Sequence, residues 1–69
     1  MPNITDKQFF YAVCKTSNVN PQDVIKLVWG RFDKYTYWYG EGSETIHGNN
    51  IWQARTNAIH RAIDEGRFR

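Results

Sequence analysis

The 69-residue chain has a single cysteine, Cys14. One cysteine cannot form an internal disulfide, and it excludes a cysteine-rich zinc cluster. A lone thiol also fits a reducing compartment, so we expect a cytoplasmic location. Without such a staple, the core of a chain this short typically stabilises the fold by only about 3–5 kcal/mol. The length is that of one small domain, residues 1–69.

Long hydrophobic stretches are also missing. No apolar run approaches the roughly 20 residues of a membrane-spanning helix, and no basic start precedes a long apolar segment. We therefore expect neither membrane association nor a signal peptide. Repeats and low-complexity segments are absent too. The 41% apolar and 23% charged residues are those of an ordinary globular domain rather than a disordered tail.

A strong charge of either sign is absent as well. The net charge is +2, and the pI of 8.9 lies just below the values above 9 that are common in nucleic-acid-binding domains. Both ends of the chain are mildly basic, whereas residues 35–48 carry only Glu41 and Glu44 as full charges. This balance permits nucleic-acid binding without arguing strongly for it.

Motifs for catalysis or metal binding are not found. The two histidines, His47 and His60, have no cysteine nearby, and a metal site would need further ligands from the few carboxylates. No residue pair has the spacing of a nucleophile and its base. We expect Cys14, on an apolar helix face, to be a buried small hydrophobe. The sequence therefore predicts no enzyme activity, no metal and no cofactor.

Aromatic residues are abundant: the chain has eleven, or 16%, and six of them lie between Trp29 and Tyr39. Large rings can fill the core of a tiny domain, since each buries about 150–250 Å². They can also stack on unpaired bases or contact a partner. A strand with alternating faces cannot bury all of them, so at least one or two of the tyrosines are expected to be exposed.

Three segments have the signals of helices. The first spans about residues 6–16: Thr5 and Gln8 form a capping box, and an apolar stripe follows at helical spacing. The stripe consists of Phe9, Phe10, Val13 and Cys14. The second spans about residues 21–30, with Asn20 as N-cap, Pro21 in the first turn and Gly30 as a stop. Its buried stripe consists of Val24, Leu27 and Val28.

The third helix spans about residues 51–65, between the breaking segment 48–50 and Gly66. Arg55 falls close to its apolar face, so we expect this side chain to extend to solvent or to pair with a carboxylate such as Asp33.

Residues of about 34–47 are expected to form a β-hairpin. Tyr35, Tyr37 and Tyr39 alternate with Thr36 and Trp38, which is the period of a strand, and a glycine-bearing turn follows at residues 40–42. A helix through residues 31–39 is the competing interpretation. The sequence thus predicts a small, mainly helical α+β fold in the order helix–helix–hairpin–helix. The alternative is an all-α bundle of three or four helices.

The first two helices resemble a helix-turn-helix unit over about residues 9–30. Cys14 stands where such units place a small residue, and Asn18 stands at the turn position that takes a positive φ. Inward apolar positions are occupied by Val19, Val24 and Leu27. With the hairpin, the element order resembles the small winged-helix domains of excisionases and merR-like regulators. The resemblance implies that the second helix enters the major groove of double-stranded DNA and that the hairpin acts as a wing.

On that interpretation the protein is a transcriptional regulator or a recombination accessory factor, with a homodimer as an option. Gln22 and Lys26 would contact bases. Phosphates would be contacted by Arg31, Lys34, Arg61, Arg67 and Arg69. Glu41 and Glu44 at the wing tip would repel phosphates.

The alternative is a small accessory protein, of the kind found in phages and mobile elements, that binds and modulates another protein. It is suggested by Ile25 and Trp29, which depart from the polar surface that a DNA-reading helix needs. The residues expected to contact such a protein partner are Ile25, Trp29, Tyr35, Tyr37, Trp38 and Tyr39.

Overall fold

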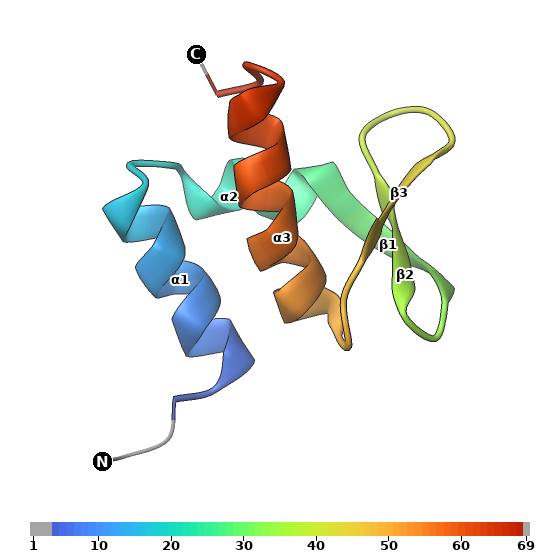
Figure 1. Ribbon diagram of the computed structural model, residues 1–69, viewed down its shortest axis with the longest axis horizontal. Helices are drawn as coiled ribbons and strands as arrows, with labels where there is room; N and C mark the ends of the chain where they lie inside the picture. The colour runs from blue at the N-terminus through green and yellow to red at the C-terminus, as the bar shows by residue number, and fades with distance from the viewer. Residues whose placement is uncertain (1–3, 69) are drawn as a thin grey trace.

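The computed structural model describes residues 4–68, which fold into three helices and one antiparallel sheet (Figure 1). In chain order the elements are α1 (Asp6–Thr16), α2 (Pro21–Leu27), β1 (Val28–Asp33), β2 (Thr36–Tyr39), β3 (Glu44–His47) and α3 (Ile51–Asp64). Helices α1 and α3 lie side by side, α2 crosses behind α3, and the sheet lies on the other side of α3 from α1 (Figure 1). About half of the chain is helical, so the predicted α+β class is confirmed and the all-helical bundle is wrong.

Helix α1 begins and ends as predicted. The Thr5 hydroxyl accepts from the Gln8 N–H at 3.1 Å, and the Gln8 side chain accepts from the Thr5 N–H at 2.9 Å. At the other end Asn18 has a φ of 57°, and the N–H of Val19 donates to the Cys14 carbonyl. This left-handed closure satisfies carbonyls that the helix itself leaves unpaired.

Helix α2 is shorter than the predicted span of residues 21–30. Asn20 caps it and Pro21 starts it as expected, but it ends at Leu27, and Val28 is already extended (φ −108°, ψ 98°). The Leu27 carbonyl accepts from the Gly40 N–H at 2.9 Å, so pairing with a later strand replaces the next helical turn. Residues 28–33 form strand β1, which the sequence did not predict.

The expected hairpin is present as part of a three-stranded sheet with the order β1-β2-β3. Thr36 lies opposite His47 and Tyr39 lies opposite Glu44, within the predicted bounds of 34–47. Lys34 and Tyr35 form the turn between β1 and β2 rather than the start of a strand. The competing helix through residues 31–39 is therefore wrong.

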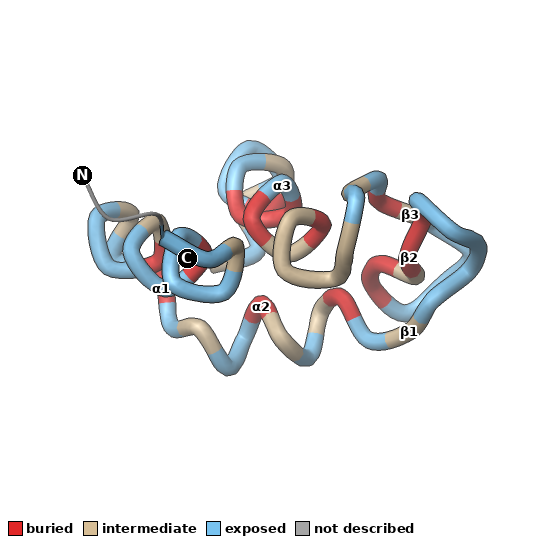
Figure 2. The backbone as a smooth tube through the Cα atoms, turned by 90° about the horizontal axis from the view of Figure 1, so that it is seen from below, coloured by how far each residue is buried: buried red, intermediate tan, exposed pale blue. Residues whose placement is uncertain are grey.

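The core lies between α1, α2, α3 and one face of the sheet (Figure 2). Phe10, Val24, Tyr39 and Ile59 are fully buried in it, and the small side chains of α3 allow the helix to approach its neighbours closely. Those small buried residues are Ala54, Ala58 and Ala62. Phe9, expected on the same stripe as Phe10, is instead 49% exposed. In contrast to this core, β1 is exposed over most of its length (Figure 2).

Helix α3 also holds both edges of the sheet. Arg55 donates to the Val28 carbonyl at 3.3 Å on the β1 edge. On the β3 edge Arg61 donates to the Thr45 carbonyl at 2.8 Å, and Asn57 donates to the His47 carbonyl at 2.9 Å. The expected pairing of Arg55 with Asp33 is thus wrong, because the guanidinium is used by the backbone of β1. These contacts occupy one carbonyl of β1 and two of β3, which makes both edges less suited to pairing with a further strand.

No helix among residues 4–68 combines the length and the apolar character needed to cross a membrane.

Candidate functional site

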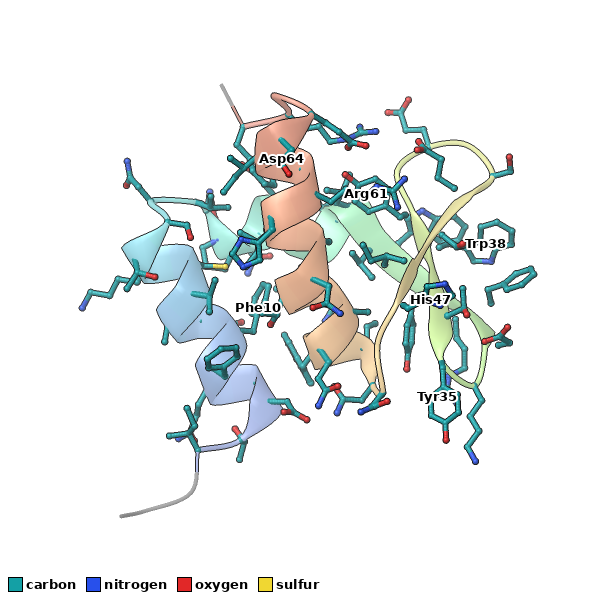
Figure 3. All side chains as sticks on the ribbon, viewed as in Figure 1. Phe10, Tyr35, Trp38, His47, Arg61 and Asp64 are labelled. Carbon is teal, nitrogen blue, oxygen red and sulfur yellow. The ribbon has the colours of Figure 1, made fainter. Side chains whose placement is uncertain are left out.

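An aromatic cluster lies on the face of the sheet that no helix covers. We use this name for Trp29, Phe32 and Trp38. Trp29 is 56% exposed and Phe32 is 55% exposed, with Trp38 half-buried between them. Figure 3 shows Trp38 on the side of the sheet away from α3. Exposed apolar patches of this kind often mark a surface that contacts a partner or a ligand.

Two irregularities of β1 build the cluster. The register with β2 shifts between Val28 and Gly30 and again between Arg31 and Asp33. The extra residues at these shifts are Trp29 and Phe32, and a bulge redirects the side chain that it contains. Trp38 reaches the same face by ordinary alternation along β2. The cluster thus depends on backbone irregularities as well as on residue type.

The rings of the cluster are packed against one another. Trp29 and Trp38 are stacked with centroids 6.1 Å apart and planes 10° apart, and Phe32 meets Trp38 edge-on at 4.9 Å. The Trp29 Nε1 donates to the Gly40 carbonyl at 2.8 Å, which fixes the indole. Rings in direct contact leave no gap for a ligand between them. The cluster is therefore a preformed platform rather than an aromatic cage.

The tyrosines of β2 face the opposite way. Tyr37 is 3% exposed and Tyr39 is fully buried, so their prediction as partner contacts is wrong: alternation turns both toward α3. Ile25 is half-buried and packs against the core, so it presents less apolar surface than an outward position would. Tyr35, in the turn before β2, is 50% exposed and remains available, as expected for at least one of the tyrosines.

Two arginines predicted to bind phosphates are engaged in a ring of ion pairs. Arg61 contacts Glu44 at 2.8 Å and Glu65 at 3.4 Å, and Arg67 contacts Glu65 at 2.7 Å and Glu44 at 3.6 Å. Both guanidinium groups also lie over the ring of Tyr39. Each of these arginines already has carboxylate partners, so a phosphate would have to compete with Glu44 and Glu65 for it.

The buried Tyr39 completes this ring by donating to the Glu65 carboxylate. Burial, together with the bond to Glu65, raises the pKa of Tyr39 to about 12. The Tyr39 hydroxyl and then Arg67 lower the pKa of Glu65 to about 2. The arrangement favours a neutral tyrosine on an ionised carboxylate and joins β2 to the end of α3, which is a structural role.

The other predicted phosphate contacts are not gathered into one site. Arg31 donates to the Tyr37 hydroxyl at 3.3 Å and so lies on the helix-facing side of the sheet, away from the aromatic cluster. Lys34 is exposed in the turn, above the ring of Tyr35. Arg69 lies outside the described residues.

The surface of α2 is polar. Gln22 and Lys26 are exposed, as predicted, and Asp23 is exposed beside them. Trp29, which the sequence placed on this helix, belongs to β1 instead. The prediction that the second helix carries an apolar ring at its end is therefore wrong.

Among residues 4–68 no group of three or more His, Cys, Asp or Glu side chains could hold a metal ion. Cys14 is fully buried, and burial raises the pKa of its thiol. A shallow cavity of about 240 Å³ lies between α1 and α3, where Asp6 accepts hydrogen bonds from Asn50 and Gln53. These contacts join the starts of the two helices.

Phe32 was not among the site residues predicted from the sequence. A strand with regular alternation places every second residue on one face, so no simple periodicity relates Trp29, Phe32 and Trp38. The available signal was Gly30 inside an aromatic run, since glycine in a strand often marks a bulge. That signal indicates an irregular strand but not which side chains it turns outward.

The chain has no match among known protein families, curated proteins or solved structures.

Proposed function

We propose that this protein binds another protein through the aromatic cluster. The observation that carries the proposal is the exposure of Trp29 and Phe32, each above one half, on a sheet face without a covering layer. An antiparallel sheet with one face in water ordinarily has polar side chains there. Tryptophan is also among the residues that contribute most to protein–protein binding.

The distribution of charge favours a protein over a nucleic acid at this surface. The centre of the face consists of aromatic and threonine side chains, and none of Trp29, Phe32, Trp38 or Thr45 carries a charge. Arg31 lies on the other face, and Lys34 lies in the turn at one end of the sheet. Nucleic-acid sites need cations along the phosphate backbone, whereas the centres of protein interfaces are depleted of charge.

The partly occupied edges of the sheet favour its open face as the contact surface. Side chains of α3 occupy carbonyls of both β1 and β3, and the register shifts of β1 make its edge irregular. A partner strand would find neither edge regular and free. A partner that packs on the face needs no such edge.

Photo-crosslinking in cells of the source organism tests the proposal. The photoreactive residue p-benzoylphenylalanine would replace Phe32 in one variant and Ile63 in a matched control. Ile63 is 44% exposed on α3 and lies beside Asn18 and Val19, so non-specific contacts of exposed apolar residues would label both positions. We expect a protein adduct from position 32 alone.

Three results would overturn the proposal. They are equal labelling from both positions, no adduct from position 32, and an adduct from position 32 that a nuclease removes. Trp29→Ala in the position-32 variant should abolish the adduct while the domain keeps its circular dichroism spectrum.

A second candidate is binding of duplex DNA through α2, in a winged-helix-like arrangement with the β2–β3 turn as the wing. The specific observation is the polar outward surface of α2: Gln22 and Lys26 are exposed, whereas Ile25 packs against the core. Trp29 belongs to β1 and Ile25 is only partly exposed, so α2 presents less apolar surface than the sequence suggested. Asp23 remains there and would repel phosphates. Such a role would be that of a regulator or recombination accessory factor, in a cytoplasmic location.

A gel shift at two salt concentrations tests this candidate, because phosphate contacts make binding salt-dependent. Lys26→Ala is the test variant and Lys15→Ala, on α1, is its control. Weaker binding of Lys26→Ala alone would support α2 as the contact. No binding of the unmodified protein at low salt would contradict the candidate.

A further inference from the structure

We propose that the aromatic cluster is covered by the aromatic cluster of a second copy of this chain, with the two sheets face to face and antiparallel. The inference rests on the proposed function, because it names the protein partner of the same surface. The supporting observation is the order of Trp29, Trp38 and Phe32 along the strands of the sheet.

The cluster is self-complementary about the centre of the sheet. β2 is the central strand, and Trp38 lies near its middle on the open face. Trp29 lies toward the Gly40 end, to which it is hydrogen-bonded, and Phe32 lies toward the opposite end, next to the turn at residues 34–35. A two-fold axis perpendicular to the strands and lying between the two faces near Trp38 therefore places Trp29 of each copy on Phe32 of the other. Such a symmetric contact needs a surface patch that complements itself.

The charges at the two ends also complement each other under this axis. Lys34 is exposed in the turn at one end, and Glu41 is exposed in the turn at the other end. Neither forms an ion pair within residues 4–68. Asp33, near Lys34, accepts the N–H of Tyr35 at 3.0 Å, so its carboxylate is directed into its own turn. The antiparallel arrangement brings Lys34 of each copy to Glu41 of the other.

The size of the face sets the strength of the contact. Three strands about 4.8 Å apart, four to six residues long at about 3.3 Å per residue, offer a face of roughly 14 by 13–20 Å. That is well below the roughly 800 Å² per partner of a standard interface. Association should therefore be weak, and it has to be measured at high protein concentration.

Sedimentation equilibrium of the full chain between about 10 µM and 1 mM is the test. We expect the average mass to rise from 8.2 kDa toward twice that value across this range. Phe32→Ser should keep the mass at that of the monomer, whereas Ile63→Ser, the matched control on α3, should leave the rise unchanged.

Charge reversal tests the antiparallel arrangement. Lys34→Glu and Glu41→Lys should each weaken self-association by roughly three- to tenfold, because each creates like-charge contacts in the pair. An equimolar mixture of the two variants should associate as well as the unmodified chain, because both end contacts then join a glutamate of one variant to a lysine of the other. Single variants that behave like the unmodified chain would overturn the antiparallel arrangement.

A monomer at 1 mM, or a Phe32→Ser variant that still associates, would overturn the second copy as the occupant. These failures are distinguishable from failure of the proposed function. If the chain is a monomer but position 32 still crosslinks to a different protein, the proposed function is supported. Only the second copy is then excluded as the partner.

Discussion

Asn18 holds a backbone conformation that an L-residue adopts at a cost. Its φ of 57° lies in the left-handed region, where the Cβ of an ordinary residue approaches the neighbouring carbonyl. Asparagine tolerates this region better than most residues, and glycine has no Cβ to strain. An asparagine at position 18 therefore allowed the turn that ends the first helix to be predicted from the sequence.

Substitutions at position 18 should separate the cost of the left-handed backbone conformation from the effect of side-chain contacts. We expect Asn18→Ala to lower the free energy of unfolding by about 1 kcal/mol, and Asn18→Gly to leave it unchanged or raise it by a few tenths. Urea unfolding followed by circular dichroism measures both. Asn49→Ala, outside any left-handed turn, is the control, and equal losses in the alanine and glycine variants at position 18 would contradict the explanation.

At the scale of elements, the connection between β3 and α3 brings Gly48 very close to the backbone of Ala54. A Cβ on Gly48 would lie 2.7 Å from the Cα of Ala54 and 2.9 Å from its Cβ, and closer still to its backbone nitrogen. These atoms belong to the first turns of α3, which the Asn50 cap and the bonds of Asn50 and Gln53 to Asp6 hold in place. The helix cannot shift away without breaking those contacts.

Gly48→Ala should therefore be strongly destabilising, by about 3 kcal/mol or more, because overpacking against fixed backbone costs at least the usual 1–3 kcal/mol. Gly42→Ala is the matched control, since a Cβ there meets nothing within 4 Å. Thermal unfolding of the two variants gives the comparison. Similar melting temperatures for both would show that α3 can move relative to β3.

The starts of the helices could be predicted from the sequence, whereas the end of α2 could not. The starts of all three helices were predictable, because the capping side chains of Thr5, Asn20 and Asn50 act on their own neighbours. The end of α2 was not predictable, because Val28 leaves the helix to pair with Tyr39 in a strand further along the chain. Local propensity is overridden where such long-range pairing is available.

At the scale of the whole molecule, the ring of charges around Tyr39 joins the start of β3, the end of α3 and the segment that follows it. Glu65 has a pKa of about 2 in the fold, against an ordinary value of 4.5. A carboxyl whose pKa is lowered by folding stabilises the fold fully above its unfolded pKa and loses this effect as the pH falls toward its folded pKa. Tyr39, with a pKa of about 12 against an ordinary 10, has the opposite sign.

Stability should accordingly decline below about pH 4.5 and again above about pH 10. Urea unfolding at a series of pH values measures this profile. Glu65→Gln should flatten the acid limb, and it should also bring the tyrosinate absorbance of Tyr39 to a lower pH. An acid limb that is identical in Glu65→Gln would assign the decline to other carboxylates.

Phe10 and Phe32 have different roles in the molecule, one in the core and one on the surface. Phe10 is fully buried beside Cys14 and Trp52, whereas Phe32 touches only the outer surface of the sheet and is 55% exposed. Phe10→Ala should cost about 3–5 kcal/mol, which is comparable to the whole stability of a domain of this size. Phe32→Ala should change stability by less than about 1 kcal/mol.

Differential scanning calorimetry of dilute protein compares the two variants, so that self-association does not contribute. We expect no cooperative transition for Phe10→Ala and a nearly unchanged one for Phe32→Ala. Loss of the transition in Phe32→Ala would make the aromatic cluster part of the structural core, and the proposed binding role would lose its basis.

The sequence by itself determined the helix starts, the turn at Asn18, the aromatic hairpin and the exclusion of a disulfide, since each follows from residues close together in the chain. The tertiary structure decided the third strand, the inward direction of Tyr37 and Tyr39, the engagement of Arg61 and Arg67, and the outward direction of Phe32. Each of these depends on a partner distant in sequence or on a register shift between strands. Residue type and spacing specify neither the distant partner nor the register shift. A shift of one residue is enough to exchange the two faces of a strand.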